Sequence, residues 1–158
     1  HYRMVTGIGM SNTAAPSLPV QGRGLMRALH HAICAGLVRA SHDCSEGGLA
    51  VALSEMCIAG RLGCLVDLSR APVEGAGIGM GSEAVLFSES NGRFVVEVAA
   101  EATQAFEQEF QGIPYAALGQ VAGQDVRLYW QGDRAETTEV LTAGVDELAR
   151  VWNGEAAL

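Results

Sequence analysis

Lysine is absent from this sequence, and all ten basic residues are arginine. The absence excludes, within this chain, a phosphate-loop lysine, a lysine that forms a Schiff base and a lysine general base. Acidic residues outnumber basic ones, and the formal net charge is −8 at pH 7. Non-specific binding to nucleic acid needs a positive surface, so we expect no nucleic-acid partner.

Long apolar runs are also absent. No run in the chain approaches the roughly 18 residues that a membrane-spanning helix needs. The start, His1-Tyr2-Arg3-Met4, lacks the regions of a signal peptide, and its first residue predicts a chain that begins inside a longer gene product or after a tag. We therefore expect no membrane partner and a cytoplasmic location. Apolar residues form 49% of the 158 residues, enough for the core of one domain.

Metal-binding and disulfide patterns are missing as well. The four cysteines, Cys34, Cys44, Cys57 and Cys64, include no C-x-x-C pair. The four histidines show neither H-x-x-x-H nor H-E-x-x-H spacing. A metal or disulfide framework needs closer pairing or an extracellular setting. The sequence therefore predicts buried or half-buried free thiols and no metal ligands.

Hydrophobic periodicity and turn residues predict a mixed order of helices and strands. We expect helices over 23–38, 48–59, 101–110 and near 145–152, a short strand or turn at 40–43, and strands over 64–68, 93–98, 115–121 and 126–130. Leu25, Leu29 and Ile33 recur every four residues and predict the buried stripe of the first helix. The last two strands flank Gly123, which predicts a hairpin.

This order lacks the strand–helix alternation of a doubly wound nucleotide-binding fold. It favours an α+β fold with helices layered on a mostly antiparallel sheet. The glycine-rich stretch at 77–81 does not have G-x-G-x-x-G spacing and predicts a flexible loop. We divide the chain into an extended lead-in at 1–20, one domain at 21–153 and a tail at 154–158.

Two polar segments are candidates for a binding site. The first precedes the helix expected at 48–59 and holds His42, Asp43, Ser45, Glu46, Gly47 and Gly48. The first N–H groups of a helix lack internal partners, and adjacent glycines let an anion approach them, which predicts nucleotide or anion binding. In the structural alternative, Asp43 and Ser45 cap the helix and the glycines permit close packing. The residues alone favour that alternative.

The second polar segment holds Ser88, Glu89 and Ser90, between two apolar, strand-like segments. We expect these residues at a strand end or bulge, facing a ligand or capping a turn. Nothing in this stretch alone identifies a reaction, and no residue of the chain is predicted to be catalytic.

Together the two segments resemble the phosphoribosylformylglycinamidine synthase family. Residues 41–50 resemble its HDxSxGGLA signature, and further matches follow in order at 51–56, 86–90, 92–96, 118–121 and 145–152. The resemblance covers about residues 20–153. It implies an α/β/α layered sandwich with partly ferredoxin-like topology.

The resemblance also implies an ATP- and Mg²⁺-dependent carbon–nitrogen ligase of purine biosynthesis. Such an enzyme phosphorylates the amide oxygen of formylglycinamide ribonucleotide, and glutamine-derived ammonia then displaces the phosphate. The family's catalytic histidine, magnesium carboxylates and most ATP contacts lie on N-terminal-type domains, which this chain lacks. We therefore expect the chain alone to be inactive and to hold neither ATP nor Mg²⁺ tightly.

Within the family, the chain resembles the second of two C-type domains. The first copy reads SESQ, and its Glu-Ser-Gln contacts the ribonucleotide, whereas here Asn91 follows Ser90. The second copy completes a pseudo-twofold scaffold and faces an auxiliary nucleotide site, so Glu89 is not expected to bind substrate. No glutaminase sequence follows Trp152, which predicts three kinds of partner: the remaining synthetase domains, a glutaminase subunit and a small bridging subunit.

Two alternatives stay open. One is a non-catalytic module that forms a homodimer or binds a ligand. The other is the C-type domain of a superfamily relative, namely a hydrogenase maturation factor, a selenophosphate synthetase or a thiamine-monophosphate kinase. Those relatives carry different residues around the paired glycines, so the His-Asp-x-Ser-Glu pattern favours the synthase.

Overall fold

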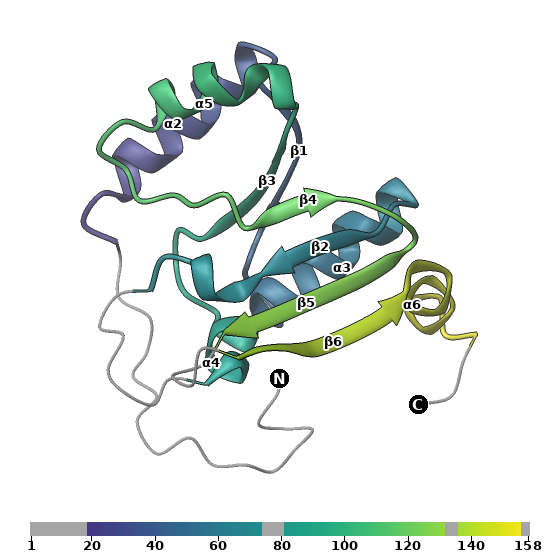
Figure 1. The fold of residues 1–158 in the computed structure, drawn as a ribbon. Helices are drawn as coiled ribbons and strands as arrows, with labels where there is room; N and C mark the ends of the chain where they lie inside the picture. The colour runs from purple at the N-terminus through teal and green to yellow at the C-terminus, as the bar shows by residue number, and fades with distance from the viewer. Residues whose placement is uncertain (1–18, 74–80, 132–135, 156–158) are drawn as a thin grey trace. The chain divides into compact units, whose positions relative to one another are not determined.

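The computed structural model describes residues 19–73, 81–131 and 136–155. Most of the predicted lead-in at 1–20, most of the glycine-rich stretch at 77–81 and the end of the tail lie outside these ranges. The chain divides into two compact units, residues 1–52 with 87–115 and residues 53–86 with 116–158. We call them unit 1 and unit 2; Figure 1 labels their helices and strands. In the described ranges, no helix has the length and apolarity needed to cross a bilayer.

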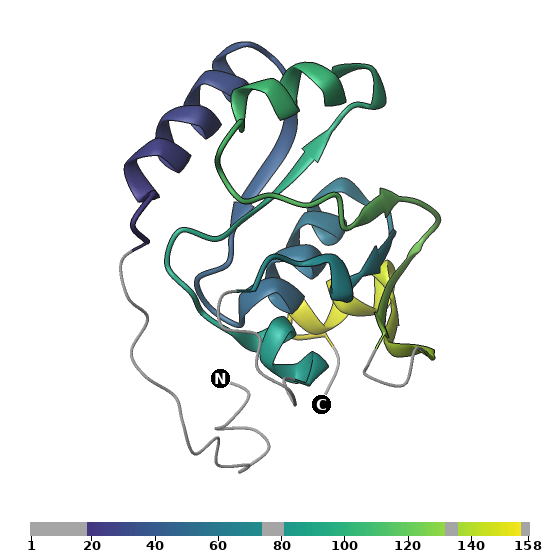
Figure 2. The same ribbon diagram turned by 60° about the vertical axis from the view of Figure 1, so that its left-hand side comes forward.

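Unit 1 combines two helices with a two-stranded sheet. Its elements in chain order are α2 (Gly22–Cys34), β1 (Val38–Asp43), β3 (Phe94–Val98), the 3-10 turn η2 (Ala100–Ala102) and α5 (Thr103–Glu109). The two strands are antiparallel, with Asp43 opposite Phe94. Figures 1 and 2 both show α2 and α5 side by side.

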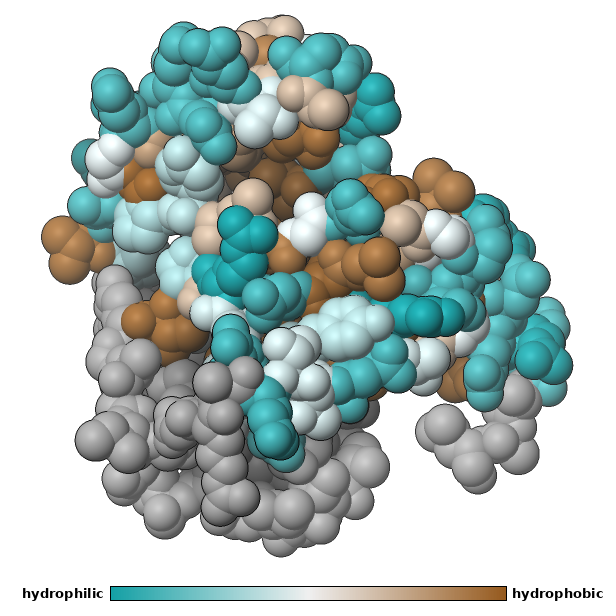
Figure 3. Space-filling view, viewed as in Figure 1, coloured by the Kyte–Doolittle hydropathy of each residue, from teal (hydrophilic) through white to brown (hydrophobic). Residues whose placement is uncertain are grey.

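The apolar core of unit 1 lies between these helices and the sheet. Its buried members are Ala28, Leu29, Ala32, Phe106 and Phe110. The stripe predicted on α2 is partly wrong, because Leu29 is buried but Ile33 is 48% exposed. A helix has 3.6 residues per turn, so a strict four-residue spacing drifts off the buried face. The outward surface over α2 and α5 is mainly hydrophilic (Figure 3).

Unit 2 contains a four-stranded sheet. Its elements are β2 (Cys64–Asp67), the 3-10 turn η1 (Leu68–Arg70), α4 (Ser82–Phe87), β4 (Gly119–Val121), β5 (Asp125–Gln131), β6 (Thr137–Gly144) and α6 (Val145–Trp152). The boundary with unit 1 falls within the helix α3 (Gly48–Gly60). The strand order is β4-β2-β5-β6. Only the β2–β5 pair is parallel among the strand pairs of the described residues. The predicted α+β class with mostly antiparallel pairing is confirmed.

The predicted hairpin at Gly123 is wrong. β4 and β5 follow one another in sequence, but β2 lies between them and pairs with both. Gly119 approaches β2 so closely that a Cβ atom would lie 1.8 Å from the carbonyl oxygen of Leu65. With β2 in the middle, both of its edges are hydrogen-bonded and its buried residues Cys64 and Val66 face the core.

Three other features differ from expectation. Residues 82–87 form α4, which buries Val85 and Leu86, instead of a strand-like segment. Strand β6 was not predicted, because its first residues are polar and exposed and give no clear alternation. Cys34 is exposed, whereas the other three cysteines are the buried free thiols that the sequence predicts.

Candidate functional site

The two polar segments predicted from the sequence meet in unit 1. Pairing of β1 with β3 places Asp43 opposite Phe94. One residue further on, the amide of Cys44 donates to the carbonyl oxygen of Arg93 at 3.0 Å. The end of the ladder therefore holds the residues that follow β1 beside those that precede β3.

A hydrogen bond between Gly47 and Glu89 joins the segments directly. The backbone N–H of Gly47 donates to Oε1 of Glu89 at 2.9 Å. Gly47 immediately precedes α3, where backbone N–H groups lack helical partners and carry a partial positive charge. A carboxylate is a favourable acceptor at this position, so Glu89 caps the start of the helix. Neither segment by itself predicted this role.

The paired glycines adopt backbone angles that other residues rarely adopt. The φ angle is +71° at Gly47 and +63° at Gly48. A Cβ atom on Gly47 would lie 2.2 Å from Cγ2 of Val51. Glycine is therefore needed at position 47 both for the turn and for close packing against the first turn of α3. This packing agrees with the structural interpretation, while anion binding stays a prediction.

Asp43 is held by its neighbours. The hydroxyl of Ser45 donates to Oδ2 of Asp43, and Nδ1–H of His42 donates to the backbone oxygen of Asp43 at 2.7 Å. The hydrogen bond from Ser45, followed by the backbone hydrogen bond and the charge of His42, holds the pKa of the Asp43 carboxyl below its usual value. Ser45 thus binds Asp43, and Glu89 accepts the amide at the helix start.

The other predicted site residues are also polar. Glu46 and Ser90 are exposed, and Ser88 is half-buried. Glu46 is adjacent to Gly47 in the chain, and the Glu89 carboxylate bonds to the Gly47 amide. A phosphate approaching this position meets negative charge and an amide that already has an acceptor.

Two carboxylates of this site already have partners within the chain. Mg²⁺ prefers carboxylate and phosphate oxygens, with near-octahedral geometry. Across the described ranges, no three His, Cys, Asp or Glu side chains gather in a way that would hold a metal ion. Asp43 and Glu89 are also engaged in the contacts just described.

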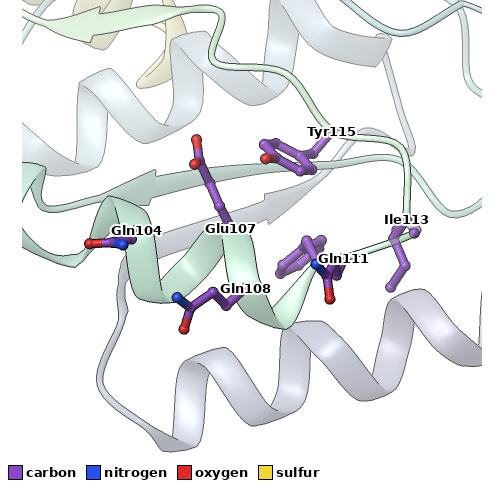
Figure 4. A pocket seen from close by; sticks show the side chains of 8 residues that line it. Gln104, Glu107, Gln108, Gln111, Ile113 and Tyr115 are labelled. Carbon is purple, nitrogen blue, oxygen red and sulfur yellow. The ribbon is translucent and has the colours of Figure 1, made fainter.

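A separate pocket of about 400 Å³ lies beside α5. Its lining residues are Gln104, Glu107, Gln108, Phe110, Gln111, Gly112, Ile113 and Tyr115. Figure 4 shows Glu107 and Tyr115 extending to the same side of the helix. Glu107 is the only charged residue in this lining, so the pocket does not favour a phosphate group. Neither predicted segment contributes to it.

Comparison with known proteins relates this arrangement to a family. Residues 6–131 match the family described as "AIR synthase related protein, C-terminal domain". The chain is 39% identical over 149 residues to phosphoribosylformylglycinamidine synthase subunit PurL of Thermococcus gammatolerans, covering 91% of this chain and 19% of that protein. It is 33% identical over 131 residues to the PurL subunit of Thermococcus kodakarensis, covering 80% and 17%. The chain thus spans less than a fifth of the length of these relatives.

The fold is similar to part of PurL from Thermotoga maritima. The structure of that protein with ATP gives a TM-score of 0.67 at 25% identity over 80% of this chain and 21% of that one. Its complex with FGAR gives a TM-score of 0.70 at 24% identity over 84% and 21%. The chain therefore belongs to the family of AIR synthase related C-terminal domains, and within that family it is similar to PurL subunits.

Proposed function

We propose that residues 21–153 are the second C-type domain of a PurL-like synthetase that makes formylglycinamidine ribonucleotide. The observation that carries the proposal is the 39% identity to a PurL subunit across 91% of this chain. Because the chain spans 19% of that relative, its contribution is one domain of a larger enzyme. Alone it would be inactive.

In the proposed parent enzyme, a glutamine-dependent carbon–nitrogen ligase, bound ATP would supply the phosphoryl group that activates the amide oxygen of formylglycinamide ribonucleotide. Phosphoryl transfer depends mainly on positioning and on neutralising charge, commonly through Mg²⁺ and lysine or arginine. This chain has no lysine, and its two candidate segments carry the carboxylates Asp43, Glu46 and Glu89. We therefore assign the main ATP and Mg²⁺ ligands to the other domains of the synthetase.

The role left for this chain is to complete the scaffold and to form one side of an auxiliary nucleotide site at residues 42–48 and 88–90. The Gly47–Glu89 hydrogen bond supports this grouping, because it brings the two segments within 2.9 Å of each other. The proposed partners are the remaining synthetase domains, a glutaminase subunit and a small bridging subunit, in the cytoplasm.

A domain-exchange assay tests the proposal. The last domain of the T. gammatolerans PurL subunit is replaced by this chain, and ATP hydrolysis that depends on formylglycinamide ribonucleotide is measured with ammonium as nitrogen donor. We expect turnover by the chimera and none by the isolated chain. The Thermococcus subunit truncated before its last domain is the matched control and should be inactive. Turnover by the isolated chain, or a folded but inactive chimera, would overturn the proposal.

A further inference from the structure

We propose that Cys57 and Cys64 are a redox-sensitive pair, which a hydroperoxide oxidises to an intramolecular disulfide that fastens the end of α3 to β2. Cys57 lies in the last turn of α3, and Cys64 is the first residue of β2. Both belong to unit 2, and neither lies in the candidate segments 42–48 and 88–90. The chemistry of the pair is therefore independent of the proposed function.

A tight turn after α3 brings the two cysteines together. Arg61 follows the helix with a left-handed backbone, at a φ of +54°. The amide of Leu62 then donates to the carbonyl oxygen of Cys57 at 3.3 Å, which folds the chain back against the last turn of the helix. Strand β2 begins directly after this turn, so Cys64 enters the core beside Cys57.

The two thiols contact each other inside unit 2. Both are buried, with 7% of Cys57 and 5% of Cys64 exposed, and neither forms a disulfide. Their side chains are hydrogen-bonded to each other, and the backbone N–H of Arg127 on β5 donates to the Cys64 sulfur. A disulfide requires two sulfurs that the backbone already holds near each other, and this contact meets that requirement.

The environment of the pair gives the two sulfurs different roles. The pKa of the Cys64 thiol is raised above its usual value, first by the hydrogen bond with Cys57 and then by burial. Cys64 therefore keeps its proton, and Cys57 is the sulfur that attacks as a thiolate. Burial also limits attack to small oxidants, so the class of oxidant is a hydroperoxide such as hydrogen peroxide.

Oxidation takes two balanced steps. The Cys57 sulfur attacks one oxygen of hydrogen peroxide and the O–O bond breaks, which gives a sulfenic acid on Cys57 and one water. The Cys64 sulfur then attacks the sulfenic sulfur, and the S–O bond breaks as the hydroxyl leaves with the Cys64 proton as a second water. The two thiols have lost two electrons, and the peroxide has gained them. Because Cys64 is in contact with Cys57, it acts at a high effective concentration in the second step.

Peptide mapping of the oxidised chain tests the proposal. The folded 158-residue chain is treated with hydrogen peroxide, its remaining thiols are blocked with iodoacetamide, and it is then unfolded and cut with trypsin. Cleavage after Arg61 and Arg70 places Cys57 in peptide 40–61 and Cys64 in peptide 62–70. We expect these two peptides to be joined as the main product, lighter by two hydrogen atoms, and to separate on reduction with dithiothreitol.

Two variants and one internal thiol serve as controls. Cys44→Ala is the matched control, because Cys44 is also buried, lies in unit 1 and shares peptide 40–61 with Cys57; it should leave the joined product unchanged. Cys64→Ala should stop the reaction at the sulfenic acid of Cys57, which dimedone traps. Oxidation of the exposed thiol of Cys34 shows that the oxidant is active.

Thermal unfolding provides a second readout. The midpoint for unit 2 should rise by about 5 °C or more on oxidation and return on reduction, because a link that closes the loop 57–64 restricts the unfolded chain. Reduced Cys57 and Cys64 in a chain whose Cys34 is oxidised would overturn the proposal. A link to Cys44, or a link that forms only in urea-unfolded chain, also overturns it. An unchanged midpoint in the linked chain overturns the fastening of α3 to β2.

Discussion

The two units hold their key segments by different means. In unit 2, Val126 and Leu128 on strand β5 have no exposed surface. This strand pairs with β2 on one edge and with β6 on the other. In unit 1, the amide that precedes α3 donates to the side chain of Glu89, and the loop before it holds the Ser45–Asp43 hydrogen bond; both carboxylates are exposed. Apolar burial is shared among many neighbours, whereas a capping hydrogen bond depends on one partner. The start of α3 therefore depends on a few identified partners, which single substitutions can test.

The largest expected effect comes from the core of unit 2. Leu128→Ala should lower the free energy of unfolding by about 2–5 kcal/mol, because it removes a fully buried side chain and leaves a cavity. Urea denaturation followed by tryptophan fluorescence measures this, since Trp130 and Trp152 both lie in unit 2. Leu62→Ala is the matched control; Leu62 is 48% exposed in the same unit, and its loss should stay within about 0.5 kcal/mol. Equal losses for the two variants would show that this core does not hold unit 2.

A smaller effect is expected at the helix start of unit 1. Gly47→Ala should lower the stability of unit 1 by about 1–3 kcal/mol, through its left-handed backbone and the close approach to Val51. Hydrogen exchange of the β1 and β3 amides measures the loss. Gly36→Ala is the control, because Gly36 has φ +72° but nothing within 4 Å of an added Cβ. If both variants lose the same stability, the contact with Val51 contributes nothing.

The smallest effect is a change in titration. Ser45→Ala should raise the pKa of Asp43 toward its usual value of 3.8, because the hydrogen bond from Ser45 is the main cause of its lowered pKa. A lowered folded-state pKa means that this carboxylate adds stability above its unfolded pKa, and that this stability is lost as pH falls through the folded value. Carbon-detected NMR titration of the Asp43 carboxyl measures the shift. Ser90→Ala serves as the control, and a shift of equal size in that variant would contradict the assigned cause.

Local signals were sufficient for much of the secondary structure. The helix expected at 48–59 is Gly48–Gly60, and the strand expected at 93–98 is Phe94–Val98. Helix ends and short strands are set by hydrogen bonds and periodicities within a few residues, so a single sequence carries these signals. The errors arose where pairing is long-range: β4 and β5 were expected to pair with each other, but both pair with β2.

The candidate site was likewise predicted only in part. The motif at 41–50 and the segment at 88–90 were recognised from their residues and from a family resemblance that the comparisons confirm. Their contact was not predicted, because Gly47 and Glu89 are 42 positions apart and neither carries a local sign of the other.

By itself, the sequence determined the family, the mixed α+β class and the places where polar residues interrupt the apolar pattern, since all three depend on residue identity and short-range spacing. Only the tertiary structure decided which strands are neighbours and which carboxylate reaches the start of α3. Those choices depend on chain segments that meet after folding, and one strand ladder, from Asp43 to the carbonyl of Arg93, brings the two halves of the site together.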